Sequence, residues 1–159
     1  MTEKKRKGAR VKFFPPYALM FGLLISSLIE VFIYPMPFMG NGSYLFLILG
    51  ITITLASFVL AIFTLTIFTA NDQNPHPKAL QNELFVGGSF RFSRNPIYLA
   101  IIIILLSCGL AFNSIWYIVS AVISYFLINY LVIIPEEIYL EKEFGKVYLD
   151  YKKSVRRWL

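Results

Sequence analysis

Four long apolar segments dominate this chain of 159 residues. They run approximately from Tyr17 to Tyr34, from Tyr44 to Ala70, from Ile97 to Phe112 and from Ile115 to Ile134. Each is near the roughly 20 residues that an α-helix needs to cross the hydrocarbon core of a bilayer. Within lipid the backbone polar groups must be satisfied internally, which a helix does within one segment. The sequence therefore predicts an all-α integral membrane protein with about four transmembrane helices.

The composition excludes an ordinary water-soluble domain. Hydrophobic residues make up 57% of the chain and charged residues only 15%, whereas soluble domains carry about 25% charged residues. The net charge of +6 is typical of the cytoplasmic flanks of membrane spans on a chain this apolar, so we expect no nucleic-acid partner. With one cysteine, Cys108, and one histidine, His76, no disulfide and no His/Cys zinc set are available. We expect His76 to be a solvated loop residue and Cys108 to be a small packing residue.

The basic residues indicate how the spans are oriented. If the N-terminus is cytoplasmic, the linkers 35–43 and 113–114 lie outside, and neither contains a charged residue. All 15 basic residues then lie inside, which is the positive-inside pattern of a multi-pass protein with both termini cytoplasmic. We expect one membrane domain over residues 1–159, made of a basic cytoplasmic arm (1–16), spans one and two (17–70), a cytoplasmic loop (71–96), a helical hairpin (97–134) and a cytoplasmic tail helix (135–159).

The tail has the pattern of an amphipathic helix. Lys and Arg lie between aromatic and apolar residues that recur at three- and four-residue spacing, namely Phe144, Tyr148, Tyr151, Val155 and Trp158. Such a helix lies on the membrane surface or packs under the spans.

Two polar stretches are predicted to meet at the cytoplasmic face. Spans three and four are joined only by Asn113 and Ser114, so they form a tight antiparallel hairpin whose open ends lie together. One end carries Arg91-Phe92-Ser93-Arg94-Asn95-Pro96-Ile97-Tyr98, and the other carries Ile134-Pro135-Glu136-Glu137-Ile138-Tyr139-Leu140. Two helix N-termini, two guanidinium groups and a carboxylate pair would together hold a zwitterionic ligand.

Each stretch also has a purely structural interpretation. Asn95 followed by a proline is a good helix start with Asn95 as the N-cap. Pro135 before two acids is another, and the arginines are also typical of interfacial residues whose charged ends reach the water. Pro135 further predicts a break in the fourth span and a crevice beside Glu136. Glu30, the one acid inside a predicted span, is a candidate functional residue.

The two polar stretches belong to a longer pattern. It runs from Leu84 through Gly88, then from Phe90 to Leu99, and after the hairpin it continues as Glu136-Glu137-x-x-Leu140-x-x-x-Phe144-Gly145-x-x-Tyr148-x-x-Tyr151. This pattern resembles the isoprenylcysteine carboxyl methyltransferases and the related phospholipid methyltransferases, over about residues 79–159. The eukaryotic motif has His where this chain has Asn95, and the prenylcysteine enzymes have a basic residue where this chain has Val132.

The resemblance implies an S-adenosyl-L-methionine-dependent methyltransferase whose lipophilic or lipidated acceptor arrives from the bilayer. By motif position, it implies cofactor contacts from Glu83, Leu84, Phe85, Phe90, Asn95, Pro96, Ile97, Tyr98 and Glu136. From charge alone, we assign catalytic roles to Glu137 and Arg94 and substrate binding to Arg91. No metal is expected, because a sulfonium methyl donor is already activated.

The resemblance leaves the activity and the oligomeric state open. The expected activity is most like protein-S-isoprenylcysteine carboxyl O-methyltransferase, and phospholipid head-group N-methylation is an alternative. A non-catalytic membrane scaffold or transport subunit is a further alternative. Polar residues concentrated on one face favour the enzyme, since a transport path needs polar groups near the middle of the spans.

Overall fold

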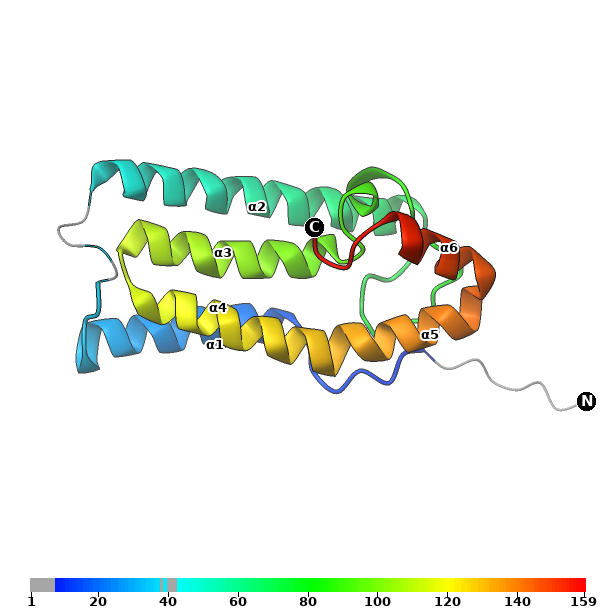
Figure 1. The fold of residues 1–159 in the computed structure, drawn as a ribbon, viewed down its shortest axis with the longest axis horizontal. Helices are drawn as coiled ribbons and strands as arrows, with labels where there is room; N and C mark the ends of the chain where they lie inside the picture. The colour runs from blue at the N-terminus through cyan, green and yellow to red at the C-terminus, as the bar shows by residue number, and fades with distance from the viewer. Residues whose placement is uncertain (1–7, 38, 40–42) are drawn as a thin grey trace, which may run out of the picture.

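The computed structural model describes residues 8–37, 39 and 43–159. Their α-helices are α1 (Pro16–Leu28), α2 (Tyr44–Ala70), α3 (Pro96–Phe112), α4 (Ile115–Ile128), α5 (Ile134–Phe144) and α6 (Lys146–Ser154) (Figure 1). Short π-helical segments, η1 (Ile29–Ile33) and η3 (Asn129–Ile133), follow α1 and α4, and a 3₁₀ turn, η2 (Gly88–Arg91), precedes α3. No strand occurs within these described ranges. The all-α prediction is confirmed.

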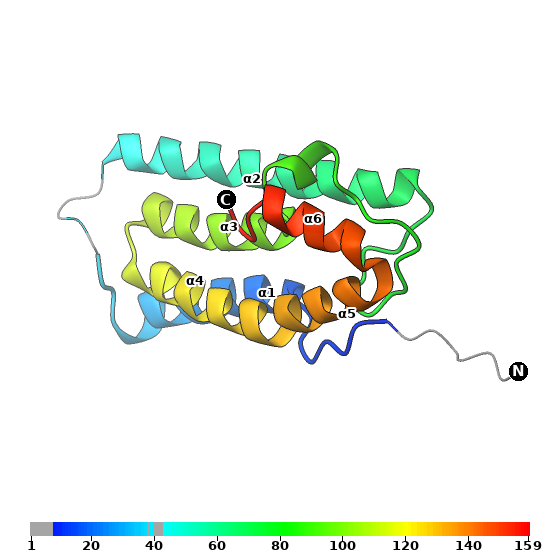
Figure 2. The same ribbon diagram turned by 45° about the vertical axis from the view of Figure 1, so that its right-hand side comes forward.

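Helices α1 to α4 lie side by side and form the bundle (Figure 2). Small polar side chains connect neighbouring helices, as is common between helices in lipid. The hydroxyls of Thr54 and Ser107 are 2.6 Å apart between α2 and α3, and those of Ser26 and Ser120 are 2.7 Å apart between α1 and α4. Many large apolar side chains on the outer surface are exposed, for example Val59 at 65%. The bundle thus buries hydroxyl pairs and leaves apolar surface for lipid.

Three described helical stretches are long and apolar enough to cross a membrane: Pro16–Ile33, Tyr44–Ala70 and Ile115–Phe144. A fourth, Pro96–Phe112, is apolar but shorter, with 17 residues. These stretches correspond to the predicted spans, and α2 has the predicted bounds. The chain is an integral membrane protein.

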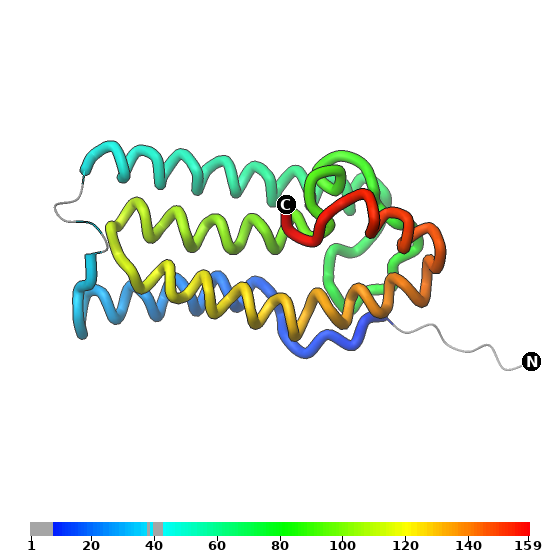
Figure 3. The backbone as a smooth tube through the Cα atoms, viewed as in Figure 1, coloured from blue at the N-terminus to red at the C-terminus, as the bar shows by residue number. Residues whose placement is uncertain are grey.

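The two ends of the bundle carry different segments (Figure 3). One end, the loop end, holds residues 8–15, the loop 71–95 and helices α5 and α6. The opposite end, the turn end, holds residues 34–37 and the turn between α3 and α4. The described parts of the three segments that the sequence predicts to be cytoplasmic therefore share one end of the bundle.

Glu30 lies at the turn end, away from the other polar motif residues. Its Oε2 accepts a hydrogen bond of 2.6 Å from the hydroxyl of Ser114 and one of 3.4 Å from the backbone N–H of Met36. The carboxylate therefore ties the end of α1 to the α3–α4 turn.

Pro135 does not break the fourth span, and this prediction was wrong. A continuous helix runs from Ile115 to Phe144, with η3 directly before α5. Pro135 has no N–H to donate to the carbonyl of Leu131, and that carbonyl instead accepts a hydrogen bond of 3.2 Å from the backbone N–H of Lys12. Because the N-terminal segment satisfies the freed carbonyl, the helix continues beyond the proline.

The tail is not the single helix that the sequence predicts. It turns at Gly145, whose φ of 52° lies in the left-handed region that favours glycine. After the turn, α6 folds back toward the bundle, and residues 155–159 continue outside any helix (Figure 2). The predicted apolar face is correct, because Tyr148 and Tyr151 are buried and Phe144 packs against them.

Candidate functional site

A cavity lies at the loop end, where the loop before α3 meets α5 and α6. Its empty volume is about 810 Å³, which includes space open to solvent. All of the predicted cofactor contacts line it: Glu83, Leu84, Phe85, Phe90, Asn95, Pro96, Ile97, Tyr98 and Glu136. Arg94 and Glu137, the two predicted catalytic residues, line it as well.

Arg91 is not among the cavity-lining residues. The 3₁₀ turn η2 directs Phe90 inward, where it is 9% exposed, and leaves Arg91 on the surface. The neighbouring Phe92 is 75% exposed. The structure therefore separates Arg91 from the other predicted site residues, and its predicted role in substrate binding remains a prediction.

The turn before Phe90 depends on a glycine and a buried hydroxyl pair. Gly88 has a φ of 59°, and a Cβ atom at this position would lie 2.8 Å from Cδ1 of Ile67. The hydroxyl of Thr64 in α2 donates a hydrogen bond of 2.9 Å to the buried hydroxyl of Ser89. These contacts hold the turn against α2 and fix the position of Phe90.

Aromatic rings form one wall of the cavity. The ring centroid of Phe90 lies 5.9 Å from that of Phe85 and 6.0 Å from that of Phe68. The hydroxyl of Tyr151 donates a hydrogen bond of 2.7 Å to the backbone carbonyl of Phe90. Such a wall presents ring faces and edges on which a planar heterocycle can stack.

A hydrogen bond joins the two ends of the α3–α4 hairpin. The hydroxyl of Tyr98, in the first turn of α3, donates to Oε1 of Glu136 in α5 at 2.9 Å. Both side chains line the cavity. The prediction that the two polar stretches meet is confirmed by this contact.

Asn95 occupies the predicted N-cap position of α3, but its side chain does not cap the helix. Its side chain makes no capping hydrogen bond, and its Nδ2 instead donates to the backbone carbonyl of Arg157 at 2.9 Å. The backbone N–H of Asn95 donates to the hydroxyl of Ser93 at 3.1 Å. The amide therefore connects the start of α3 to the end of the chain.

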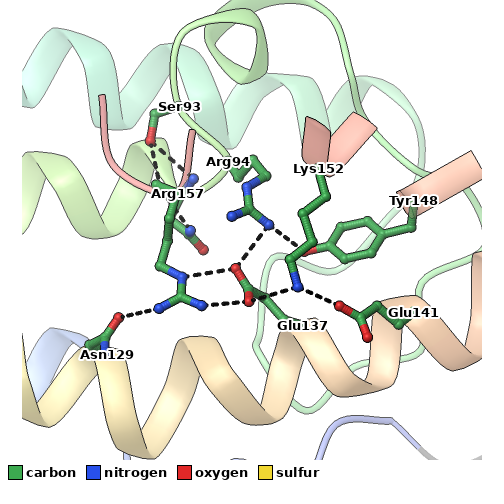
Figure 4. Close-up of polar contacts among 9 residues, drawn as sticks. Ser93, Arg94, Asn129, Glu137, Glu141, Tyr148, Lys152 and Arg157 are labelled. Atoms are coloured by element: carbon green, nitrogen blue, oxygen red, sulfur yellow. Dashed lines mark hydrogen bonds and ion pairs between the residues drawn. The ribbon is translucent and has the colours of Figure 1, made fainter. Parts of the chain in front are cut away.

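Glu137 is the centre of an ionic cluster (Figure 4). Its side chain is 8% exposed, and its oxygens lie 2.9 Å from Nη1 of Arg94, 2.7 Å from Nη2 of Arg157 and 3.6 Å from Nζ of Lys152. Nε of Arg157 also donates to the carboxylate at 3.0 Å, so this pair is bidentate. Lys152 pairs in addition with Glu141. Three cations against two carboxylates leave a surplus positive charge beside the cavity.

Arg94 has one donor that no described residue satisfies. Its Nη1 contacts Glu137 and donates to the hydroxyl of Tyr148 at 3.4 Å. Its Nε is buried and has no hydrogen-bond partner among the described residues. Burial, and then the charge of Glu137, raise the pKa of Tyr148 to about 12, so this hydroxyl remains neutral. A buried N–H without a partner is costly, which favours an acceptor from a bound ligand.

The sequence analysis missed three members of the cluster. Arg157 and Lys152 were interpreted only as topology signals, and Asn129, which accepts a hydrogen bond of 3.1 Å from Nη1 of Arg157, was not singled out. The position of Lys152 could have been found from the helical spacing of the tail. Arg157 lies beyond the end of α6, so no periodicity predicts where its side chain points.

The remaining candidate residues lie outside the cavity lining. His76 is exposed, as predicted, and its ring stacks on Phe14 with centroids 5.3 Å apart. Cys108 is partly buried in α3. Within the described residues, no group of three or more His, Cys, Asp and Glu side chains is placed to hold a metal ion.

Comparison with known proteins identifies one matching family and one similar protein. A family model described as phospholipid methyltransferase matches residues 38–147, which include the predicted cofactor contacts. A protein of Haemophilus influenzae (strain ATCC 51907 / DSM 11121 / KW20 / Rd), described as uncharacterized, is 40% identical over 63 residues, which are 40% of this chain and all of that protein. No solved structure matches the chain.

Proposed function

The chain belongs to the phospholipid methyltransferase family, and from this premise we propose that it transfers the methyl group of S-adenosyl-L-methionine to a lipophilic acceptor. Membership makes it a membrane methyltransferase; the cofactor, the acceptor and the residue roles are our proposal. One observation carries it: residues assigned to the cofactor by motif position line one cavity, although they come from three separate segments. The chain would act as one multi-pass membrane domain with the loop end and both termini in the cytoplasm.

The residues present fit this cofactor. Arg94 would bind its carboxylate, because Arg94 lines the cavity and belongs to a cluster with surplus positive charge. Glu136, held by Tyr98, would accept hydrogen bonds from the ammonium group or the ribose hydroxyls. The aromatic wall of Phe85 and Phe90 would stack with the adenine ring.

The protein supplies alignment and protection from water. When bound, S-adenosyl-L-methionine provides a methyl group that is already activated by its sulfonium. Leu84 and Leu140 line the cavity beside the aromatic wall, and this apolar lining would exclude water from the reacting atoms. Fixed side chains at the start of α3 and in α5 would hold the reactants in line, which supplies a large part of the rate in such transfers.

The acceptor that we propose first is a carboxylate on a lipophilic molecule, as in protein-S-isoprenylcysteine carboxyl O-methylation. A carboxylate is already ionised and needs no base. Glu137 contacts three cations that stabilise its charge, and the adjacent Glu136 accepts a hydrogen bond from Tyr98. This arrangement makes Glu137 a weak proton acceptor, so we propose that it orders the cations rather than removing a proton.

The second candidate acceptor is the amine of a phospholipid head group. The description of the matching family favours it. An amine must lose a proton during the reaction. Of the adjacent carboxylates Glu136 and Glu137, which both line the cavity, Glu136 would accept this proton, because Glu137 already contacts three cations. Arg91, exposed beside Phe92, would bind the lipid phosphate at the membrane surface.

Calorimetry with the purified protein in detergent tests the cofactor site. We expect S-adenosyl-L-methionine to bind the parent protein, and Glu136→Ala and Tyr98→Phe to weaken binding. Asp150→Ala and Tyr130→Phe are matched controls, because both residues are exposed and neither lines the cavity. The absence of binding by the parent protein would refute the proposed function, and equal binding by all four variants would refute the site.

Labelled methyl groups identify the acceptor. The protein in vesicles is supplied with labelled S-adenosyl-L-methionine and either farnesylcysteine or phosphatidylethanolamine. We expect label in the carboxyl ester of farnesylcysteine, which alkaline hydrolysis releases. Label in phosphatidylethanolamine alone would instead establish the second candidate.

A further inference from the structure

Residues 155–159 follow α6 outside any helix and return to the residues that precede α3. The backbone N–H of Arg94 donates to the carbonyl of Arg156 at 3.1 Å, and Nδ2 of Asn95 donates to the carbonyl of Arg157 at 2.9 Å. Both donors come from the start of α3, where residues line the cavity. The end of the chain is therefore bonded directly to the wall of the candidate site.

Arg157 is the side chain through which this segment reaches Glu137 (Figure 4). Its Nε and Nη2 donate to the two carboxylate oxygens at 3.0 and 2.7 Å, and its Nη1 donates to Oδ1 of Asn129 at 3.1 Å. The hydrogen bond with Glu137 raises the pKa of Arg157, so the guanidinium remains charged. The planar fork of an arginine matches a carboxylate and occupies both of its oxygens.

Arg157 affects the position of Arg94 through the carboxylate of Glu137, which both arginines contact. Arg94 contacts Glu137 through Nη1, and its buried Nε–H has no partner among the described residues. Without Arg157, neither oxygen of Glu137 would be held by a bidentate partner, and the contact of Glu137 with Nη1 of Arg94 would loosen. The guanidinium of Arg94, which lines the cavity, would then no longer be held in place.

We propose that Arg157 is a positioning residue of the cofactor site, which holds Glu137 and thereby fixes the guanidinium of Arg94 for the cofactor carboxylate. This inference rests on the proposed function, because it assigns Arg94 to that carboxylate. Arg157 is not among the cavity-lining residues, so it acts through Glu137 and Arg94. The segment 155–159 is accordingly part of the site, although it lies outside the span 38–147 that the family model matches.

The test compares Arg157→Ala with Arg156→Ala in the full-length protein. Both variants remove one positive charge from adjacent positions, but the side chain of Arg156 is exposed. In calorimetric titration with S-adenosyl-L-methionine, we expect Arg157→Ala to bind about tenfold more weakly than the parent, which is an ordinary effect between residues of one hydrogen-bond network. We expect Arg156→Ala to change the affinity by less than about twofold. Equal affinities of the two variants, with normal binding by the parent protein, would overturn the inference.

Kinetics distinguish positioning from a loss of structure. A positioning role predicts that Arg157→Ala raises KM for S-adenosyl-L-methionine about tenfold and changes kcat at saturating cofactor by less than about threefold. Arg157→Lys retains the charge without the fork, so we expect an affinity between those of Arg157→Ala and the parent; this variant also serves if the alanine variant does not fold. A lower kcat with unchanged KM would overturn the inference, whereas no binding by the parent would overturn the proposed function itself.

Discussion

Replacing Glu137 with glutamine tests whether the ionic cluster stabilises the protein. The substitution keeps the size of the side chain and removes the charge that faces three cations. The side chain of Arg94 is 8% exposed, whereas those of Arg157 and Lys152 are 32% and 35% exposed. Removing one partner of a buried pair costs about 3–5 kcal/mol, and exposed pairs contribute only about 0–1 kcal/mol each. We therefore expect Arg94 to account for most of the loss.

The expected decrease in the free energy of unfolding is about 3 kcal/mol, the lower limit for a buried pair, because the amide oxygen still accepts a hydrogen bond. The assay is reversible unfolding in mixed micelles with increasing denaturing detergent, followed by circular dichroism. Glu141→Gln is the matched control, since its 36% exposed side chain pairs with Lys152 alone among the described cations, and we expect a loss below about 1 kcal/mol. Equal losses in both variants would refute the reasoning that burial of Arg94 decides the energy.

Three further predictions concern single contacts. Tyr98→Phe removes the hydrogen bond to Glu136 and should weaken the binding of S-adenosyl-L-methionine about two- to tenfold, since a hydrogen bond contributes about 0.5–1.5 kcal/mol. Unchanged affinity in calorimetry would contradict this. Gly88→Ala should lower the free energy of unfolding by about 1–2 kcal/mol, because Gly88 has a positive φ and a Cβ there would press on Ile67. Gly87→Ala is the control and should change the free energy of unfolding little, since the space around Gly87 is open. Similar losses in thermal unfolding of the two variants would show that backbone conformation is not the cause. Glu30→Gln should leave the rate of methyl transfer unchanged within about twofold, because Glu30 bonds to Ser114 at the turn end; a large decrease in the rate would assign it a functional role.

Local sequence patterns predict most of this fold. The span Tyr44–Ala70 has the predicted bounds because a long apolar run in lipid has only the helix as a solution. The short link through Asn113 and Ser114 requires a hairpin, and the hydrogen bond between Tyr98 and Glu136 shows that its ends meet. The amphipathic spacing correctly identifies the buried face of α6.

The features that the sequence could not reveal depend on distant parts of the chain. The helix continues through Pro135 because Lys12, more than 100 residues away in the sequence, donates its N–H to the freed carbonyl. The role of Arg157 depends on an extended segment whose direction is set by hydrogen bonds to Arg94 and Asn95. Neither contact leaves a periodic signal, so each requires the coordinates.

The length of the continuous helix from Ile115 to Phe144 determines how far the cavity lies from the hydrocarbon core of a bilayer. Its 30 residues extend over about 45 Å at 1.5 Å per residue, whereas the hydrocarbon core is about 30 Å thick. The roughly 15 Å that remain are long enough to place Glu136 and Glu137 outside the lipid on the same helix that crosses it. We therefore expect the rate of the proposed methyl transfer to depend on bilayer thickness, because lipids with longer acyl chains would bring the interface closer to the cavity and shorter ones would draw it away.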